Sequence, residues 1–244
     1  MKKLVSVFFS VLLVLSLSAC GSGNRNGMAD RQEGNEAEDL ATGIESNTES
    51  SMEDGNAAGI DNGSILIAYF SVMETDGVDA VSSASRVVAD GELLGNNQYI
   101  AQIIQRETGG DLFSIETVQE YPTTHEPLLE FAYEEKSDNA RPELASHIEN
   151  ADSYDVIFLG FPNWNADLPM PLYTFLEEYD FSGKRIIPFT THGGSGFSRT
   201  IQTISELQPD AAVISEGLSI SRNNVPGAEN DVVDWVNSLD SRVQ

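Results

Sequence analysis

Short runs of consecutive apolar residues recur from residue 64 onward, and each is followed by a segment with helical periodicity. The runs cover residues 65–70, 155–160, 185–189 and 211–214. Strands that are apolar along their whole length must be covered on both faces, as in a parallel sheet between two layers of helices. The segment 111–116 alternates more between apolar and polar residues, which predicts an edge strand.

Five longer helical segments separate or follow these strands. They are expected over residues 98–108, 126–137, 170–179, 198–207 and 229–239, with a shorter helical piece over 142–148. Strand and helix alternate five times over residues 64–240, which predicts an α/β domain with a doubly wound, five-stranded parallel sheet and helices on both faces. Because the edge strand comes second in the chain, the expected strand order is 2-1-3-4-5.

The first twenty residues form a segment of their own. Lys2 and Lys3 precede an apolar run over residues 4–17, and small residues lead to Cys20. A basic start, a short apolar stretch and a small-residue cleavage site predict a signal peptide over residues 1–20. The four residues ending in Cys20 resemble a bacterial lipobox, which implies cleavage before Cys20 and diacylglycerol on its sulfur. The alternative is a plain signal peptide with an incidental cysteine.

Residues 21–60 have the composition of a tether. They contain no aromatic residue, are rich in Gly, Asn, Ser and Glu, and hold two arginines against nine acids. Such a segment buries too little apolar surface to offset the entropy of ordering, so we expect a disordered acidic linker. Under the lipobox interpretation it would join a lipid anchor in the cell membrane to a domain over residues 61–244 that faces outside the cytoplasm.

The charge of the chain narrows its possible partners. Thirteen basic residues against 39 acidic ones give a formal net charge of −26. A surface this acidic repels phosphate backbones and anionic headgroups, so nucleic acid is not expected as a partner, and membrane contact is expected only through the lipid. A single cysteine excludes a disulfide framework and a cysteine-based metal site within one chain, and we expect no metal.

Ligands of wound parallel sheets bind at the carboxyl ends of the strands, so the residues that follow each strand are the candidates for a site. Ser71 follows the first strand, and Gly95, Asn96 and Asn97 open the first helix. A hydroxyl beside a helix N-terminus can hold an anion through neutral donors, which this acidic chain would need for a phosphate. The alternative is that Asn96 only caps the helix.

Two further loops carry unusual residues. Pro162, Asn163 and Trp164 follow the third strand, where the indole could stack on a planar ring or pack beneath its own loop. The fourth strand leads into a glycine-rich loop whose backbone amides can approach a ligand closely. Its residues are Thr191, His192, Gly193, Gly194, Ser195 and Gly196. His192 is a potential proton donor, or simply a solvated side chain in a flexible connection.

These three loops together resemble those of flavodoxin-like proteins with Tyr-Phe-Ser, Pro-Asn-Trp and Thr-His-Gly-Gly-Ser-Gly motifs. The resemblance covers residues 64–240 and implies FMN as the cofactor. It implies phosphate contacts from Ser71 and residues 95–97, and ring contacts from residues 162–164 and 191–196. The chain departs from the family in an insertion over residues 72–94, whose Ser82, Ser83 and Ser85 could replace missing hydroxyls or form only a surface flap.

The sequence leaves three functions open. The first is an FMN-binding redox protein that passes electrons to a partner protein or a small-molecule acceptor, with no catalytic residue identified. The second is an FMN-dependent NAD(P)H or quinone reductase, which would need a second pocket over the flavin. The third is a lipoprotein binding module that has lost its flavin.

Overall fold

The computed structural model describes residues 64–75 and 86–242, so residues 1–63, the serines at 82, 83 and 85, and the last two residues lie outside the description. The predicted signal peptide, Cys20 and the tether fall in the part that is not described. The described strands are β1 (Ile65–Tyr69), β2 (Arg86–Ala89), β3 (Glu92–Gly95), β4 (Asp111–Ser114), β5 (Val156–Pro162), β6 (Arg185–His192), β7 (Ala212–Val213) and β8 (Leu218–Ser221).

The central sheet confirms the predicted architecture. Its order is β4-β1-β5-β6-β7, with β8 also paired to β6, and every pairing is parallel. β4, the second strand of this sheet along the chain, lies at one edge, as expected. The last position is shared by two short strands, because β7 pairs with β6 up to Ile186 and β8 resumes at Phe189. Pro188 lies between them on β6 and has no N–H to donate to a neighbouring strand.

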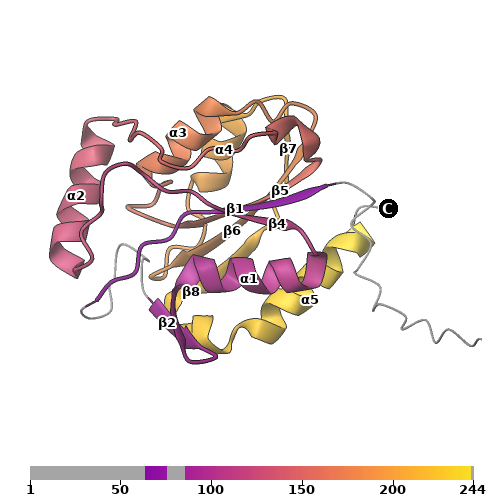
Figure 1. Ribbon diagram of the computed structural model, residues 1–244, viewed down its shortest axis with the longest axis horizontal. Coiled ribbons are helices and arrows are strands. Elements are labelled where there is room, and N and C mark those ends of the chain that lie inside the picture. Colours follow the sequence, from indigo (N-terminus) through magenta and orange to yellow (C-terminus); the bar gives the residue numbers. More distant parts are fainter. Residues whose placement is uncertain (1–63, 76–85, 243–244) are drawn as a thin grey trace, which may run out of the picture. The chain divides into compact units, whose positions relative to one another are not determined.

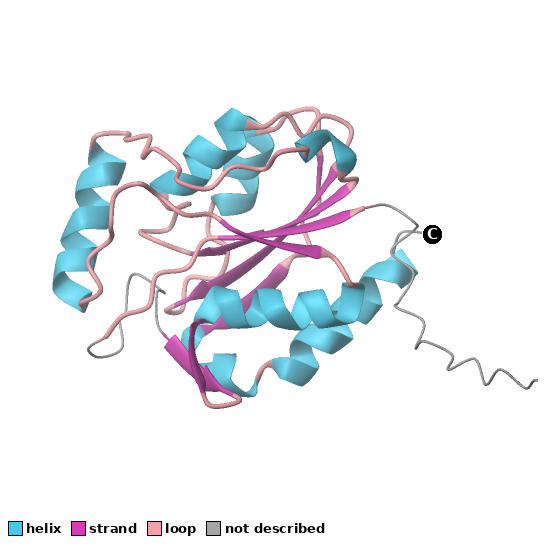
Figure 2. Ribbon diagram, in the orientation of Figure 1, coloured by secondary structure: helices cyan, strands magenta, loops and turns pink. Residues whose placement is uncertain are grey.

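Helices cover both faces of this sheet (Figure 1). The helices are α1 (Asn96–Thr108), α2 (His125–Ser137), α3 (Met170–Glu178), α4 (Thr200–Leu207) and α5 (Glu229–Arg242), with short 3₁₀ turns at Ala151–Ser153 and Arg222–Gly227. Figure 2 shows α1 and α5 together on one face, and α3 and α4 on the other. Side chains of β1 alternate between the two cores: Ile67 packs on the α1 and α5 side, and Leu66 on the α3 and α4 side.

The expected helical piece over residues 142–148 is wrong, because this segment is extended. It runs beside the chain that follows β4, with an isolated antiparallel bridge between Thr117 and Leu144. The N–H of Val118 donates to Glu143 O at 2.9 Å, and the N–H of Ala145 donates to Glu116 O at 2.8 Å. Leu144 is buried, so the segment satisfies its backbone by pairing while it anchors one apolar side chain.

The second half of the 72–94 insertion folds into a hairpin. β2 and β3 pair antiparallel as a separate two-stranded sheet. Asp90 and Gly91 form the turn at φ 52° and 83°, the left-handed backbone that a two-residue hairpin loop requires. Val87 and Leu94, which face each other across the strands, are buried and fasten the hairpin to the core.

Across residues 64–75 and 86–242, none of the helices combines the length and the apolar character needed to span a bilayer.

Candidate functional site

The loops after β1, β5 and β6 meet at the carboxyl edge of the sheet. The N–H of Asn163 donates to Thr191 O at 2.9 Å, which joins the loops after β5 and β6. The Nδ2 group of Asn97 donates to Thr191 Oγ1 at 3.1 Å, which ties the start of α1 to the end of β6. Thr191 therefore connects two groups of residues that the sequence predicted to act on opposite ends of one ligand.

The start of α1 lies directly against the chain that leaves β1. A Cβ atom on Gly95 would come within 2.2 Å of Ser71 Oγ, so only glycine allows this approach. The N–H of Gly95 donates to Gln98 Oε1 at 3.2 Å. Gly95 is the N-cap of α1, and Asn96 is the first residue inside the helix, so the interpretation of Asn96 as a cap is wrong.

Asn96 and Asn97 carry buried polar atoms that lack hydrogen-bond partners. Each residue is 1% exposed. Within the described residues, the Nδ2 and Oδ1 atoms of Asn96 have no hydrogen-bond partner. The Oδ1 atom of Asn97 has none either. An unsatisfied buried polar group costs about 1–3 kcal/mol, so such atoms at a helix N-terminus fit a site whose ligand supplies the missing bonds.

Asn163 braces the glycine-rich loop after β6. Its Nδ2 donates to Gly196 O at 2.5 Å and to Ser198 Oγ at 3.1 Å. The side chain is 1% exposed, and its Oδ1 has no partner within the described chain. One end of this amide therefore holds the loop in place, while the other end is still available to a ligand or a water.

Trp164 packs beneath its own loop, which is one of the two arrangements that the sequence allowed. The side chain is 2% exposed. Its ring meets Phe70 edge-on at 5.5 Å between centroids and lies tilted at 5.6 Å from Tyr121. The next two residues, Asn165 and Ala166, have φ of 52° and 59° and turn the chain back toward Asp167. Stacking of Trp164 on a flavin would require this aromatic cluster to open.

The glycine-rich loop presents its backbone to solvent. Residues 193–195 are exposed, and Gly194 and Gly196 have φ of 133° and 59°. The N–H of Gly194 donates to Nδ1 of His192 at 2.9 Å, so this nitrogen is unprotonated and the neutral ring carries its proton on Nε2. Burial lowers the pKa of His192 from its usual value. The imidazole is therefore neutral near pH 7.

A buried carboxyl group beside this edge was not predicted from the sequence. Glu135 of α2 accepts hydrogen bonds from the Tyr121 hydroxyl, at 2.9 Å to Oε1 and 2.7 Å to Oε2, and a short one from Gln119 Nε2. Burial raises the pKa of Glu135, and these hydrogen bonds oppose the rise. The signal was present in α2, because Leu128, Ala132 and Glu135 follow the spacing of a buried helical face.

The next residue of α2, Lys136, holds the turn that carries Trp164. Its Nζ donates to Asn165 O at 2.8 Å and lies 3.4 Å from Asp167 Oδ2. The other carboxylate oxygen, Asp167 Oδ1, accepts from the N–H of Leu168 at 3.0 Å and from the Tyr173 hydroxyl at 3.1 Å. Adjacent residues of α2 thus fasten the loops that follow β4 and β5.

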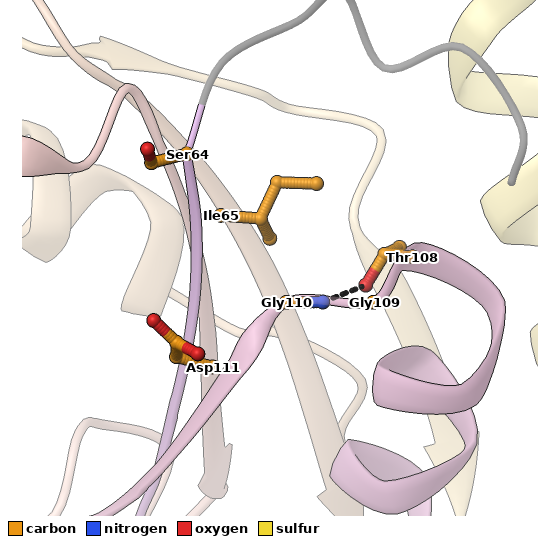
Figure 3. A pocket seen from close by; sticks show the side chains of 6 residues that line it. All are labelled: Ser64, Ile65, Thr108, Gly109, Gly110 and Asp111. Atoms are coloured by element: carbon orange, nitrogen blue, oxygen red, sulfur yellow. Dashed lines mark hydrogen bonds between the residues drawn. The ribbon is translucent and has the colours of Figure 1, made fainter.

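Two clefts lie at opposite ends of β1. The first, of about 430 Å³, adjoins the candidate site and is lined by Phe70, Ser71, Val72 and residues 114–117, 119–121 and 123. The second, of about 260 Å³, lies where β1 and β4 begin and is shown in Figure 3 with the hydrogen bond from the N–H of Gly110 to Thr108 Oγ1. Because ligands of wound sheets bind at the carboxyl ends of strands, the first cleft belongs to the functional edge.

Comparison with known proteins identifies relatives of this fold. The sequence profile of the Flavodoxin family matches residues 85–239. A protein from Bacteroides eggerthii described as a flavoprotein superposes with a TM-score of 0.54 at 26% identity, covering 72% of this chain and 98% of that one. A second such protein, from Bacteroides uniformis, gives a TM-score of 0.53 at 23% identity over 71% of this chain and 97% of its own. A comparison with functionally curated proteins found no match.

Proposed function

The chain belongs to the flavodoxin family, and we propose that it is an FMN-binding redox protein that transfers electrons outside the cytoplasm. Lipid on Cys20 would hold it at the cell membrane. The observation that carries the proposal is the pair of buried asparagines with unpartnered amide atoms at the start of α1; the residue before them, Gly95, lies against Ser71 at the carboxyl edge of the sheet.

The phosphate of FMN fits the start of α1. The described part of the candidate site holds no cluster of arginine or lysine to neutralise a phosphate. Neutral donors would bind the phosphate instead: the Asn96 amide, the Ser71 hydroxyl and the first backbone N–H groups of the helix. Asn97 is committed to Thr191 through its Nδ2, so its contribution is to hold the two ends of the site at a fixed separation.

The polar edge of the flavin fits the loop after β6. The exposed backbone amides of Gly193 and Ser195 are the available donors there, and neutral His192 can donate through Nε2. Bound FMN supplies reversible one- and two-electron transfer at its isoalloxazine ring. The protein itself then needs to orient the cofactor and set the electric field around it, so no acid or base need be assigned.

Replacing Asn96 by Asp tests the proposed phosphate site. The helix N-terminus favours a carboxylate but position 96 is buried, so circular dichroism first checks that the variant folds; in the folded variant the carboxylate repels a phosphate. We expect the dissociation constant of FMN, titrated into flavin-free protein, to rise by at least about tenfold, or 1.4 kcal/mol. Riboflavin, which lacks the phosphate, should bind the variant as it binds the original protein.

Asn237→Asp, at an exposed position of α5, is the control and should bind FMN normally. The purified full chain should also be yellow and release FMN when denatured. A colourless protein that takes up no added FMN would favour the flavin-free binding module, and unchanged FMN affinity after Asn96→Asp would remove Asn96 from the site.

The cleft of about 430 Å³ beside Ser71 favours a second candidate, a reductase with a substrate pocket. Glu116 and Glu120 line this cleft, and no lysine or arginine of the described chain does. An acidic lining disfavours the phosphates of NAD(P)H, so an uncharged acceptor such as a quinone suits it better. Steady turnover of quinone with NADH or NADPH would support the reductase, and reversible reduction without turnover would support the carrier.

Membrane attachment is tested at Cys20. Expressed with its own leader in a bacterium, the full chain should sediment with membranes and incorporate labelled fatty acid. Cys20→Ser should abolish both, because the thioether to diacylglycerol cannot form on serine. Lipid incorporation into the serine variant would show that Cys20 is not the anchor.

A further inference from the structure

The β2–β3 hairpin exposes two large apolar side chains directly opposite each other. Val88 and Leu93 are paired across the strands and are 69% and 51% exposed. The neighbouring pair, Val87 and Leu94, points the other way and is buried. The buried pair fastens the hairpin to the core, so the outward pair is not needed for that attachment.

Met73 extends this apolar surface toward the candidate site. Side chains alternate along a strand, so Leu93 and Gly95 share the outward face of β3. Met73, 37% exposed, has its Cγ within 3.5 Å of the position that a Cβ on Gly95 would occupy, and Ser71 Oγ lies within 2.2 Å of the same position. We call Val88, Leu93 and Met73 the apolar strip; it ends beside Ser71. Figure 1 shows β2 next to the start of α1.

The hairpin is also joined to the candidate site along the chain. β3 ends at Gly95 and α1 begins at Asn96, with no residue between them. Contact made with the apolar strip is therefore made within a few residues of the two buried asparagines.

Charge selects what can cover the apolar strip. Exposed Asp90 and Glu92 flank it at the hairpin turn, and the only described basic residue on the hairpin, Arg86, donates to Glu74 O. A second copy of the chain carries the same net charge of −26, and residues 21–60 are acidic as well. Both are repelled, as are anionic lipids, whereas a basic protein is attracted.

We propose that the apolar strip is the docking site for a basic redox protein, whose own apolar patch is surrounded by lysine or arginine. This inference rests on the proposed function, because the partner would exchange electrons with the flavin whose phosphate is held beside Ser71. Removal of the three side chains from water stabilises the contact, and the acidic rim speeds encounter and sets orientation.

Mitochondrial cytochrome c is a suitable probe, since it is a basic haem protein with lysines around an apolar haem edge. The FMN-loaded full chain is reduced with a stoichiometric amount of dithionite and mixed with ferric cytochrome c in a stopped-flow instrument. In each transfer the reduced flavin loses one electron and the ferric haem gains it. The second-order rate constant is measured at low and high ionic strength.

The double variant Val88→Ser/Leu93→Ser should lower this rate constant by about tenfold at both ionic strengths, because the lost contact is apolar. Asp90→Asn/Glu92→Gln should lower it at low salt only, because salt screens charge steering. Tyr133→Ser removes a large side chain of α2 that is 57% exposed and lies away from the hairpin, and it should leave the rate unchanged.

Two further measurements keep the outcomes distinct. Unaltered FMN affinity in the double variant shows that the flavin site is intact, so a slower rate reflects docking. Binding of cytochrome c to the flavin-free protein, followed by surface plasmon resonance at low salt, makes the same comparison without electron transfer. If the serine double variant matches the original protein in rate and in binding, the apolar strip is not a docking site, whatever the fate of the proposed function.

Discussion

Single residues at the carboxyl edge of the sheet are held in place by bonds to distant parts of the chain. Thr191 accepts from Asn97 and from the backbone of Asn163, and Asn163 in turn holds Gly196. Each partner comes from a different loop, so a change in one loop is transmitted to the others. These hydrogen bonds hold the three loops together without charged groups.

His192 should make the stability of the fold depend on pH. Burial lowers its pKa, so below the ordinary value of 6.5 the unfolded chain takes up a proton more readily than the folded one. The free energy of unfolding of the original protein, relative to that of His192→Gln, should therefore fall as the pH falls from 7.5 to 5.5. The slope of this difference against pH should correspond to the uptake of at most about one proton on unfolding. Urea unfolding at a series of pH values measures this difference.

His147 gives a control of opposite sign. Its Nδ1 lies 2.6 Å from Glu178 Oε1, and this hydrogen bond raises its pKa. The original protein should gain stability over His147→Gln below pH 6.5 and lose that gain as the pH rises through the elevated pKa. The same sign for both histidines would contradict the geometry assigned to His192.

Ala166 is a residue in a conformation that favours glycine. Its φ of 59° places a Cβ in the left-handed region, which costs about 1 kcal/mol or more. Ala166→Gly should raise the free energy of unfolding by about 1 kcal/mol, measured by urea denaturation. Ala145→Gly, at a position without a positive φ, should instead lower it slightly because glycine adds freedom to the unfolded chain. A loss of stability on Ala166→Gly would show that the turn carries no strain.

The surroundings of Trp164 show what a sequence pattern omits at this scale. The pattern placed the residue in the correct loop but left stacking and packing equally open. The choice depends on Phe70 and Tyr121, which lie far away in the chain and reach Trp164 only through the fold. The three motif loops were predicted to meet at the carboxyl edge, and they do; the bonds that fix them, such as Asn97 to Thr191, have no local sequence signal.

Among the secondary-structure elements, α2 contributes to the candidate site although no residue of this helix was predicted to do so. Glu135 accepts a hydrogen bond from Tyr121 in the loop after β4, and the adjacent Lys136 donates one to Asn165 O in the loop after β5. Lys136→Met should lower the free energy of unfolding by about 1 kcal/mol, since its Nζ is partly exposed and a charged hydrogen bond is lost. It should also weaken FMN binding several-fold by loosening the turn that carries Trp164.

Lys184 provides the comparison for this prediction. Its Nζ donates to Asp152 O and Tyr154 O at the opposite edge of the sheet. Lys184→Met should cost similar stability and leave FMN affinity unchanged. An equal loss of affinity in both variants, measured by fluorescence titration, would assign the effect to general loosening instead of the Trp164 turn.

Helices with a regular apolar spacing were predicted well, whereas segments whose conformation depends on backbone pairing with another segment were not. The five long helices lie within two or three residues of their expected bounds because their apolar spacing is local. Residues 142–148 looked helical after Pro142, but backbone bonds to the chain after β4 made them extended. Asp90-Gly91 between apolar residues is a hairpin turn signal, so the β2–β3 hairpin is predictable from the sequence within the segment identified only as an insertion.

At the scale of the whole molecule, the order of the sheet could be predicted because the sequence distinguishes buried strands from an edge strand. Buried strands are continuous apolar runs, whereas the second strand in the chain alternates between apolar and polar residues. The doubly wound domain is confirmed, and the order 2-1-3-4-5 holds for β4-β1-β5-β6-β7; the described sheet has six strands instead of the expected five, because β8 also pairs with β6. The division of the last position between β7 and β8 was not foreseen, because it depends on Pro188 in the neighbouring strand. The predicted signal peptide and tether remain predictions, since they lie outside the described residues.

The net charge of the molecule should be visible in its redox potential. Residues 61–244 hold nine basic and 30 acidic residues, and fully reduced FMN tends to be an anion. A negative field disfavours that extra charge, so the last one-electron step of reduction should lie below its value in free FMN. We expect a difference of at least about 59 mV, which is one tenfold change in a one-electron equilibrium. Spectroelectrochemistry measures it, and added salt should reduce the difference by screening. A potential at or above that of free FMN, insensitive to salt, would show that local donors such as the amides of Gly193 and Ser195 outweigh the charge of the whole molecule.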